Sequence, residues 1–268
     1  MGAQIPAGLF EREGDVFHPS EFTRGPWRAD AQHGGPPSAL LARLTEPQID
    51  DRDFLAHIEV ELTRPVPLAP LRGEVRSERV SGRVSRIHGT LLADGEVVAR
   101  SNALVLRESV PAEPEWSTTD QPAVGTPDTA EPVDAPRWAS GDRTTYHRNG
   151  VEHRFTAGSF RDPGPAVDWV RLRQPLVVGE ATSGLQRVLA AADFGSGISA
   201  LYGASSSFGM INANLTVSIW RPVQGEWVSL DAQSRIGPQG TGLGVTQLGD
   251  VHGPVGVATQ SLLGYDLG

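Results

Sequence analysis

The chain has 268 residues, which is enough for one large domain or for two domains of about 100–150 residues each. It is 38% hydrophobic and 21% charged, as is typical of globular proteins, and its net charge of −9 argues against nucleic acid as a partner because phosphate binding needs a clustered positive surface. The sequence contains no cysteine and no lysine, which excludes disulfides, thiolate metal sites, and thiol or lysine nucleophiles.

No apolar run is as long as the roughly 18–20 residues that a membrane-spanning helix requires. The N-terminal sequence MGAQIPAGLFEREG lacks a basic region followed by an apolar core, so no secretory signal is predicted. We therefore expect a cytoplasmic protein that does not bind membranes.

The first half is predicted to contain a hairpin, a helix and an antiparallel meander. Residues 8–27 suit a hairpin that turns near Gly14. The sequence QHGGPPSALLARLTE predicts a helix over about 36–46, since proline fits the first helical turn. Alternation of apolar and polar residues predicts the first strand of the meander. The expected strands are 58–63, 74–80, 84–92 and 97–106, the last two joined by a turn at Asp94–Gly95.

The second half is predicted to repeat this order after a linker. Residues 108–140 are rich in proline, acidic and small residues, which cannot bury much surface, and are interpreted as the linker. A hairpin is expected at 144–155 around Asn149–Gly150, and a helix at 180–192. The expected strands are 169–173, 215–220, 227–235, 242–249 and 255–263.

Two stretches of the chain are similar to one another. The stretch that begins HIEVELTRP at His57 matches the stretch that begins NLTVSIWRP at Asn214, and the similarity continues to the end of each meander. A repeat of this length indicates one structural unit used twice, like a two-fold dimer made covalent. We predict an α+β fold with an N-terminal unit of residues 1–107, a linker of 108–140 and a C-terminal unit of 141–268.

This duplicated pattern resembles the double hot-dog acyl-CoA thioesterases, the TesB-like group of the thioesterase superfamily. The resemblance implies a tandem double hot-dog fold, in which each unit is an antiparallel sheet wrapped around a central helix. It also implies hydrolysis of acyl-CoA to free acid and CoA by a positioned water, with no covalent intermediate and no cofactor. A homo-oligomer is expected, since hot-dog sheets tend to pair edge to edge. The residues that carry the resemblance are His33-Gly34-Gly35, LQRVLAAADFG at 185–195, NANLTVSIWRP at 212–222, GEWVSLDAQS at 225–234 and GPVGVATQSLL at 253–263.

The resemblance also implies a set of site residues. In that family an Asp, a Ser or Thr, and a Gln hold the attacking water, and the matching residues here are Asn214, Ser234 and Gln260. The glycine-rich start of the first helix, His33-Gly34-Gly35, would lie opposite them and bind the substrate. Backbone N–H groups at a helix start are suited to stabilise an oxyanion. Each of these residues also has an ordinary structural interpretation: a turn into a helix, a surface serine, or a solvated glutamine.

Asn214 departs from the family pattern, because a neutral amide can orient a water but cannot accept its proton. The chain is then a slow hydrolase, uses another base, or is a non-catalytic acyl-CoA or fatty-acyl binding protein. His57 matches Asn214 in the first unit and could act as a base near neutral pH.

Other chemistries are less favoured. Hydration or dehydration of an acyl thioester would need a histidine and a carboxylate, for which His33 is the candidate histidine. No metal-ligand spacing and no GxSxG motif is present, so neither a metal site nor a serine nucleophile is predicted.

Overall fold

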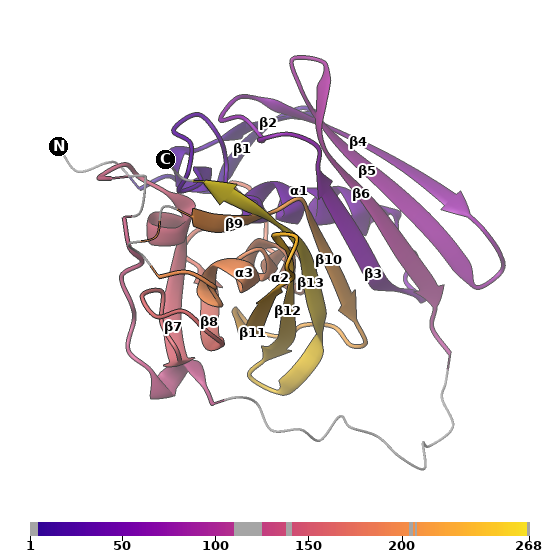
Figure 1. Cartoon of the computed structure of the whole chain (residues 1–268). Helices are drawn as coiled ribbons and strands as arrows, with labels where there is room; N and C mark the ends of the chain where they lie inside the picture. The colour runs from indigo at the N-terminus through magenta and orange to yellow at the C-terminus, as the bar shows by residue number, and fades with distance from the viewer. Residues whose placement is uncertain (1–4, 110–124, 138–140, 204–205, 207, 267–268) are drawn as a thin grey trace, which may run out of the picture.

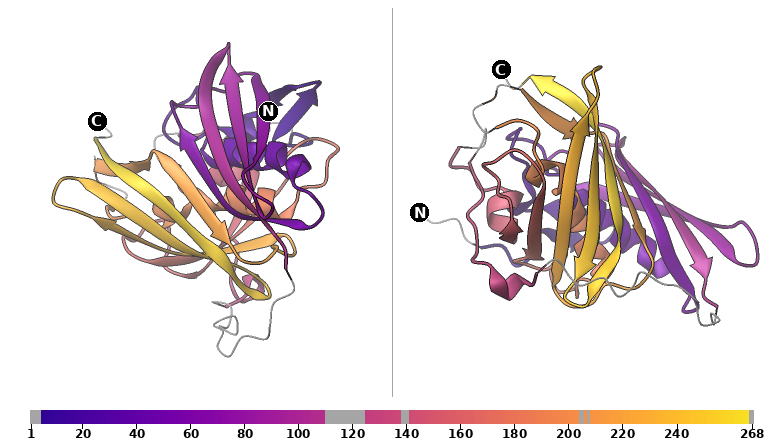
Figure 2. Two further views of the ribbon diagram at one scale, coloured as in Figure 1. Left: turned by 90° about the vertical axis from the view of Figure 1, so that its right-hand side faces the viewer. Right: turned by 60° about the horizontal axis from the view of Figure 1, so that its bottom comes forward.

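The computed structural model describes residues 5–109, 125–137, 141–203, 206 and 208–266 (Figure 1). The strands of this part of the chain form one antiparallel sheet in the order β1-β2-β4-β5-β6-β3-β10-β13-β12-β11-β8-β7, with β9 paired to β13. The sheet curves around the helices α1 and α2, which lie side by side against its inner face (Figures 1 and 2). This is the predicted α+β double hot-dog architecture.

The first half contains β1 and β2, α1, and a four-stranded meander, as the sequence predicts. Gly14, at the turn of the β1–β2 hairpin, has φ +63°, and Asp94 and Gly95 both have positive φ at the turn between β5 and β6. The elements are β1 (Phe10–Glu13), β2 (Val16–Pro19), α1 (Gly35–Thr45), β3 (Asp53–Leu62), β4 (Leu71–Arg79), β5 (Val84–Ala93) and β6 (Glu96–Arg107), with short 3-10 turns at Glu21–Thr23 and Glu46–Gln48.

The second half contains the predicted helix and strands together with two elements that were not predicted, α3 and β9. Two short turns precede them, a 3-10 turn at Pro127–Thr129 and a π-helical turn η5 at Tyr146–Gly150. The elements are β7 (Val151–Ala157), β8 (Ala166–Leu172), α2 (Gly184–Ala192), α3 (Gly195–Ile198), β9 (Phe208–Asn212), β10 (Asn214–Ile219), β11 (Trp227–Ile236), β12 (Thr241–Asp250) and β13 (Gly253–Asp266).

The hairpin predicted around Asn149–Gly150 is wrong. Asn149 closes a helical turn instead, because its Oδ1 accepts from the backbone N–H of Thr145 at 3.0 Å while its own N–H donates to the carbonyl of Thr145 at 2.8 Å. The two-residue hairpin turn needs positive φ at both central residues, and neither Asn149 nor Gly150 has it. A single strand, β7, follows this turn.

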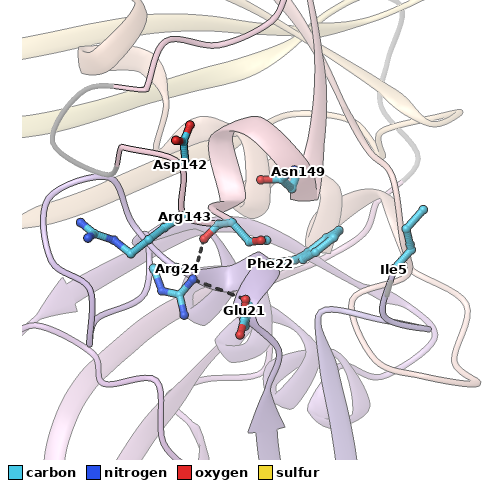
Figure 3. A pocket seen from close by; sticks show the side chains of 8 residues that line it. Ile5, Glu21, Phe22, Arg24, Asp142, Arg143 and Asn149 are labelled. Atoms are coloured by element: carbon cyan, nitrogen blue, oxygen red, sulfur yellow. Dashed lines mark hydrogen bonds and ion pairs between the residues drawn. The ribbon is translucent and has the colours of Figure 1, made fainter. Parts of the chain in front are cut away.

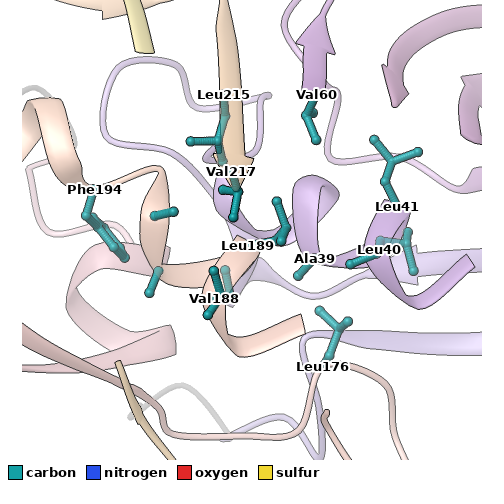
Figure 4. Packing of buried hydrophobic residues seen from close by; sticks show 14 of the residues in the cluster. Ala39, Leu40, Leu41, Val60, Leu176, Val188, Leu189, Phe194, Leu215 and Val217 are labelled. Carbon is teal, nitrogen blue, oxygen red and sulfur yellow. The ribbon is translucent and has the colours of Figure 1, made fainter. Parts of the chain in front are cut away.

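Strands β3 and β10 join the two halves at the centre of the sheet, with pairing from Glu61–Asn214 to His57–Ser218. The core lies between this sheet and the helices (Figure 4). Leu40 and Leu41 of α1 are fully buried, as are Val188 and Leu189 of α2. Burying each side chain of this size contributes about 1.5–3 kcal/mol. Packing of the two helices therefore holds both halves around one core.

The described residues test only part of the predicted linker, and they test only in part the prediction that no segment spans a membrane. Residues 110–124 and 138–140 of the predicted linker lie outside the described residues. The described part, 125–137, contacts β7: the backbone of Val133 pairs with His153, and Arg154 donates to the carbonyl of Pro127. The domain boundaries and the homo-oligomer stay predictions.

Within the described residues, no helix has the length and apolar character needed to cross a membrane.

Candidate functional site

The candidate site lies where α1 begins and α2 ends. The two helices are antiparallel and closely packed at this point: a Cβ on Gly35 would lie 2.4 Å from the carbonyl oxygen of Ala190. His33 and Gly34 come directly before α1, and Asp193 comes directly after α2. Close helix packing therefore places the predicted His33-Gly34-Gly35 segment against a carboxylate that the sequence analysis did not single out.

Both oxygens of the Asp193 carboxylate have a donor. Oδ2 lies 2.8 Å from Nδ1 of His33, and Oδ1 accepts from Nδ2 of Asn212 at 2.8 Å. The backbone N–H of Gly35 points to this pair: it lies 3.1 Å from the same His33 Nδ1, and it helps to lower the pKa of Asp193. The Asp193 side chain is 5% exposed and that of His33 is 12% exposed. The pair is thus largely buried, and His33 is the more exposed of the two.

Nδ1 of His33 faces one donor and one acceptor, so its proton must be assigned from geometry. The 2.8 Å contact to Asp193 is shorter than the 3.1 Å contact from Gly35, and charge-assisted bonds are the stronger kind. We therefore assign the proton to Nδ1, donated to Asp193. In the neutral ring this leaves Nε2 as the basic nitrogen.

The pKa of Asp193 is held below its ordinary value. Burial alone would raise this pKa, but His33, Asn212 and the Gly35 amide together outweigh the burial. Asp193 is consequently a fixed negative charge at neutral pH. A carboxylate in this state keeps an imidazole in one tautomer and stabilises it when it becomes protonated.

The low pKa of Asp193 predicts loss of stability in acid. A carboxyl group whose pKa is lowered on folding contributes stability above its unfolded value, near 3.8, and this contribution disappears as pH falls through the lower folded value. We expect the free energy of unfolding of the wild type to fall more steeply than that of Asp193→Asn below about pH 4. Urea titrations followed by tryptophan fluorescence between neutral and acidic pH measure both slopes. Equal slopes would contradict the assigned ionisation.

Gln260 and Ser234 lie on the inner face of the sheet beneath α3, and Gln260 contacts Asp193. They flank Gly244 in one row across β11, β12 and β13. Gln260 Oε1 accepts from the N–H of Ser196 at 2.9 Å, and its Nε2 donates to the carbonyl of Asp193 at 3.2 Å. Ser234 Oγ lies 2.8 Å from Oγ of Ser199. Of the three predicted water-holding residues, the structure thus places Gln260 in contact with Asp193, and Ser234 on the same face but against Ser199.

Asn214 lies on the opposite face of the sheet. Asn212 pairs with Leu262, whereas the Oδ1 of Asn214 accepts from the N–H of Ser261 at 2.9 Å. The break at Ala213 between β9 and β10 shifts the register by one residue, and a shift of one residue exchanges the faces of a strand. Asn212 therefore points inward to Asp193, and Asn214 points outward.

His57 lies on this outer face as well. Its Nδ1 is 2.9 Å from Oγ of Ser218, on the exposed side of the β3–β10 pair. Neither His57 nor Asn214 is therefore part of the candidate site around Asp193 and Gln260.

Placing a carboxylate at Asn214 is expected to leave the Asp193 site undisturbed. Asn214→Asp would add its charge on the outer face, next to the backbone of Ser261, and the stability change should stay within about 0.5 kcal/mol, as for most surface substitutions. Asn212→Ala is the matched comparison and should lower stability by about 1–3 kcal/mol, because it removes the donor from the buried Asp193 Oδ1. Urea unfolding measures both changes. An equal loss of stability in Asn214→Asp would place Asn214 at the site.

Models of known families match most of the chain. The model described as the acyl-CoA thioesterase C-terminal domain matches residues 120–263, and the one described as the acyl-CoA thioesterase N-terminal domain matches residues 23–106. The chain belongs to the acyl-CoA thioesterase family. None of the curated proteins matches it with significance.

Solved structures of low sequence identity share the fold of this family member. A Thermobifida fusca protein described as a candidate thioesterase II has a TM-score of 0.72 at 17% identity, covering 96% of this chain and 94% of that chain. A hot-dog protein from Alicyclobacillus acidocaldarius has a TM-score of 0.71 at 16% identity, with 97% and 96% covered. Acyl-CoA thioesterase II from Mycobacterium marinum has a TM-score of 0.62 at 14% identity, with 97% and 95% covered.

The other end of the helix pair repeats the arrangement without a histidine. Glu46, directly after α1, accepts from Oγ of Ser183 and, at 2.6 Å, from Nε2 of Gln186 at the start of α2. Ser183 also caps α2 by accepting from the Gln186 N–H. Serine and glutamine do not titrate near neutral pH, so among the residues described at the two helix junctions only the Asp193 junction holds a group suited to acid–base chemistry.

A surface hollow of about 630 Å³ lies near the site but does not include it (Figure 3). The backbone of Thr23 and Arg24 lies between them, since Thr23 accepts from His33 and Arg24 accepts from Tyr146. Arg24 itself donates to the carbonyl of Thr144 and pairs with Glu21. The hollow has no histidine and no buried carboxylate in its lining, which consists of Ile5, Glu21, Phe22, Arg24, Asp142, Arg143, Thr144 and Asn149.

Sequence reasoning missed Asp193 and Asn212. Asp193 was present in the segment LQRVLAAADFG, where it is the one acidic residue, directly after an apolar helix. That position was a usable signal, because the end of a helix carries negative partial charge and an acid there is unfavourable unless it has a partner. Asn212 gave no comparable signal. In the described ranges, no group of three or more acidic or histidine residues is arranged to hold a metal ion.

Proposed function

We propose that this chain hydrolyses acyl-CoA thioesters to free acid and CoA, and that His33 with Asp193 activates the attacking water. The observation that carries the proposal is the 2.8 Å contact between His33 Nδ1 and a buried carboxylate at the start of the central helix. Membership of the acyl-CoA thioesterase family supplies the substrate class.

In the proposed reaction, His33 Nε2 takes a proton from water while the water oxygen bonds to the thioester carbonyl carbon. Asp193 stabilises the resulting imidazolium through Nδ1–H. When the C–S bond breaks, the imidazolium returns the proton to the leaving thiolate, which gives CoA as a thiol and the acyl group as the acid. General acid–base catalysis of this kind typically contributes about 10²–10⁴-fold.

The glycines before α1 are proposed to receive the carbonyl oxygen. Pro36 and Pro37 have no N–H, so Gly34 and Gly35 supply the backbone donors nearest to this helix start. A Cβ on Gly34 would lie 2.7 Å from Oδ2 of Asp193, so a side chain here would displace the carboxylate. The Gly35 amide lies 3.1 Å from Nδ1 of His33, and binding an oxyanion would redirect it.

Gln260 and Ser234 are proposed to support the site rather than to touch the substrate. Gln260 uses both ends of its amide, on Ser196 and on the carbonyl of Asp193. Ser234 contacts Ser199 at the end of α3. Together they fix the segment that carries Asp193. Asn214, on the outer face, has no part in this mechanism.

The same His33–Asp193 pair favours a second candidate, the hydration or dehydration of an acyl thioester. That chemistry needs a histidine and a carboxylate beside the thioester, and the pair supplies both. It differs from hydrolysis in that the C–S bond stays intact.

Three measurements on the wild-type protein separate these functions. Thiol release is followed with a disulfide reagent for acyl-CoAs of short, medium, long and branched chains, hydration is followed as loss of enoyl-CoA absorbance, and binding is followed by calorimetry. Thiol release is the expected result. Loss of enoyl absorbance without thiol release would favour hydration. Tight binding without either reaction would favour a non-catalytic acyl-CoA binding protein and would overturn the proposal.

A further inference from the structure

The ring of Phe194, the residue after Asp193, lies between two imidazoles. Its centroid is 4.5 Å from that of His33 and 4.8 Å from that of His153, which meets it nearly at a right angle. Tyr146 stacks on the same ring at 5.4 Å. Phe194 is buried, so its orientation is set by these neighbours. The tilt of the His33 ring is therefore coupled to that of His153 through one phenyl ring.

His153 is held in the same way as His33. Its Nδ1 lies 2.6 Å from Oδ2 of Asp168, and Oδ1 of Asp168 accepts from the backbone N–H of Arg154 at 3.1 Å. Both side chains are buried, at 1% and 0% exposure. Phe194 thus separates two histidine–carboxylate pairs, one on α1 and α2 and the other on β7 and β8.

Packing alone does not account for a histidine at position 153. Its Nε2 is buried and has no hydrogen-bond partner among the described residues. Burial raises the pKa of Asp168 although His153 and the Arg154 amide oppose it, so its charge is unfavourable there. Two apolar side chains would fill the same volume without either cost. The polar pair does provide one thing that they would not: the Asp168 bond fixes the rotation of the ring.

We propose that His153 is a positioning residue for the site, whose ring holds Phe194 against His33 in the orientation that directs His33 Nδ1 to Asp193. Asp168 sets the rotation of the His153 ring, and perpendicular aromatic contacts have a preferred geometry that transmits it to Phe194. The effect of His153 on catalysis rests on the proposed function and on the role of His33 in it. The effect of His153 on the orientation of the His33 ring does not depend on that function.

Two variants separate the ring of His153 from its hydrogen bond. His153→Asn keeps a donor near Asp168 but removes the ring, and it is expected to lower kcat at least tenfold with little change in KM, since small misplacements at a reacting centre cost up to about 10²-fold. The double variant His153→Phe with Asp168→Leu restores a ring without the Asp168 bond that fixes its rotation, so it is expected to recover Tm but not kcat. The ¹⁵N resonances of His33 are recorded in the same proteins without substrate, and we expect the Nδ1–H tautomer signature to weaken in His153→Asn and to stay weak in the double variant.

Phe155→Leu is the matched control. Phe155 packs beside His153, with ring centroids 6.5 Å apart, and against Phe160 at 4.9 Å, so its loss removes comparable aromatic packing from the same layer. It should lower Tm without changing kcat or the His33 resonances.

Two results would overturn the positioning role. The first is a His153→Asn protein with wild-type kcat, unchanged His33 resonances and a Tm loss equal to that of Phe155→Leu. The second is a double variant whose kcat and His33 resonances both match those of the wild type. If the wild type releases no thiol, the proposed function fails, and the resonances alone then decide whether His153 positions His33.

Discussion

Replacing Asp193 with Asn is expected to lower acyl-CoA turnover by about 10²–10⁴-fold, the usual contribution of general acid–base catalysis. The neutral amide no longer stabilises an imidazolium at His33. Its NH₂ group must face either Nδ2 of Asn212 or Nδ1 of His33, both of which are donors in the wild type. The His33 ring then loses its fixed tautomer. We expect kcat to fall and KM for the acyl-CoA to change little, because the carboxylate itself is 5% exposed and has little surface for substrate contact.

Glu46→Gln provides the control for this substitution. It makes the same chemical change at the corresponding position of the other helix junction, where the carboxylate accepts from Ser183 and Gln186. Loss of that charge should weaken the contact between the helices but leave turnover near the wild-type value. Equal losses of turnover in Asp193→Asn and Glu46→Gln would mean that both junctions act through stability, and the base would have to be sought elsewhere.

The repeat and the periodicities in the sequence were sufficient to predict a duplicated α+β order of elements, and the family resemblance implied the double hot-dog arrangement. The alternation of apolar and polar residues predicted β3, and the prolines before an apolar segment predicted α1. Both signals are local patterns that show which residues become buried. The two duplicated segments begin in β3 and β10, which pair at the centre of one sheet, a pairing that the sequence analysis did not predict. The predicted features depend on residues close together in the chain or on similarity between the halves, both of which a single sequence contains.

The site was less predictable because it depends on long-range contacts and on one irregularity. His33 and Asp193 belong to different units and meet only because α1 and α2 pack with the start of one against the end of the other. The register shift at Ala213 exchanges the faces of Asn212 and Asn214, and a period-two pattern gives no sign of a single inserted residue. The family pattern indicated the right segment, and the irregularity decided which asparagine enters the site.

Gly35→Ala is expected to cause a clear loss of stability. The added Cβ would lie 2.4 Å from the carbonyl oxygen of Ala190 and 3.1 Å from the ring of Tyr146. The clash is with backbone, which cannot rotate away, so α1 and α2 must separate. Overpacking of this kind costs about 1–3 kcal/mol. The Ala190 carbonyl also accepts from the hydroxyl of Tyr146 at 3.0 Å, so its displacement would strain that bond as well.

Gly197→Ala tests whether the cost comes from the clash rather than from the loss of a glycine. Gly197 lies in α3, and a Cβ there would meet nothing within 4 Å. Alanine at position 197 should therefore raise the free energy of unfolding by about 0.4–1 kcal/mol, because it makes the unfolded chain less flexible. Gly35→Ala should instead lower the free energy of unfolding. Urea unfolding at neutral pH measures both. Because separation of the helices draws His33 away from Asp193, Gly35→Ala should also lose turnover under conditions in which it is still folded. Retained turnover would show that the site tolerates a wider helix spacing than the 2.8 Å contact implies.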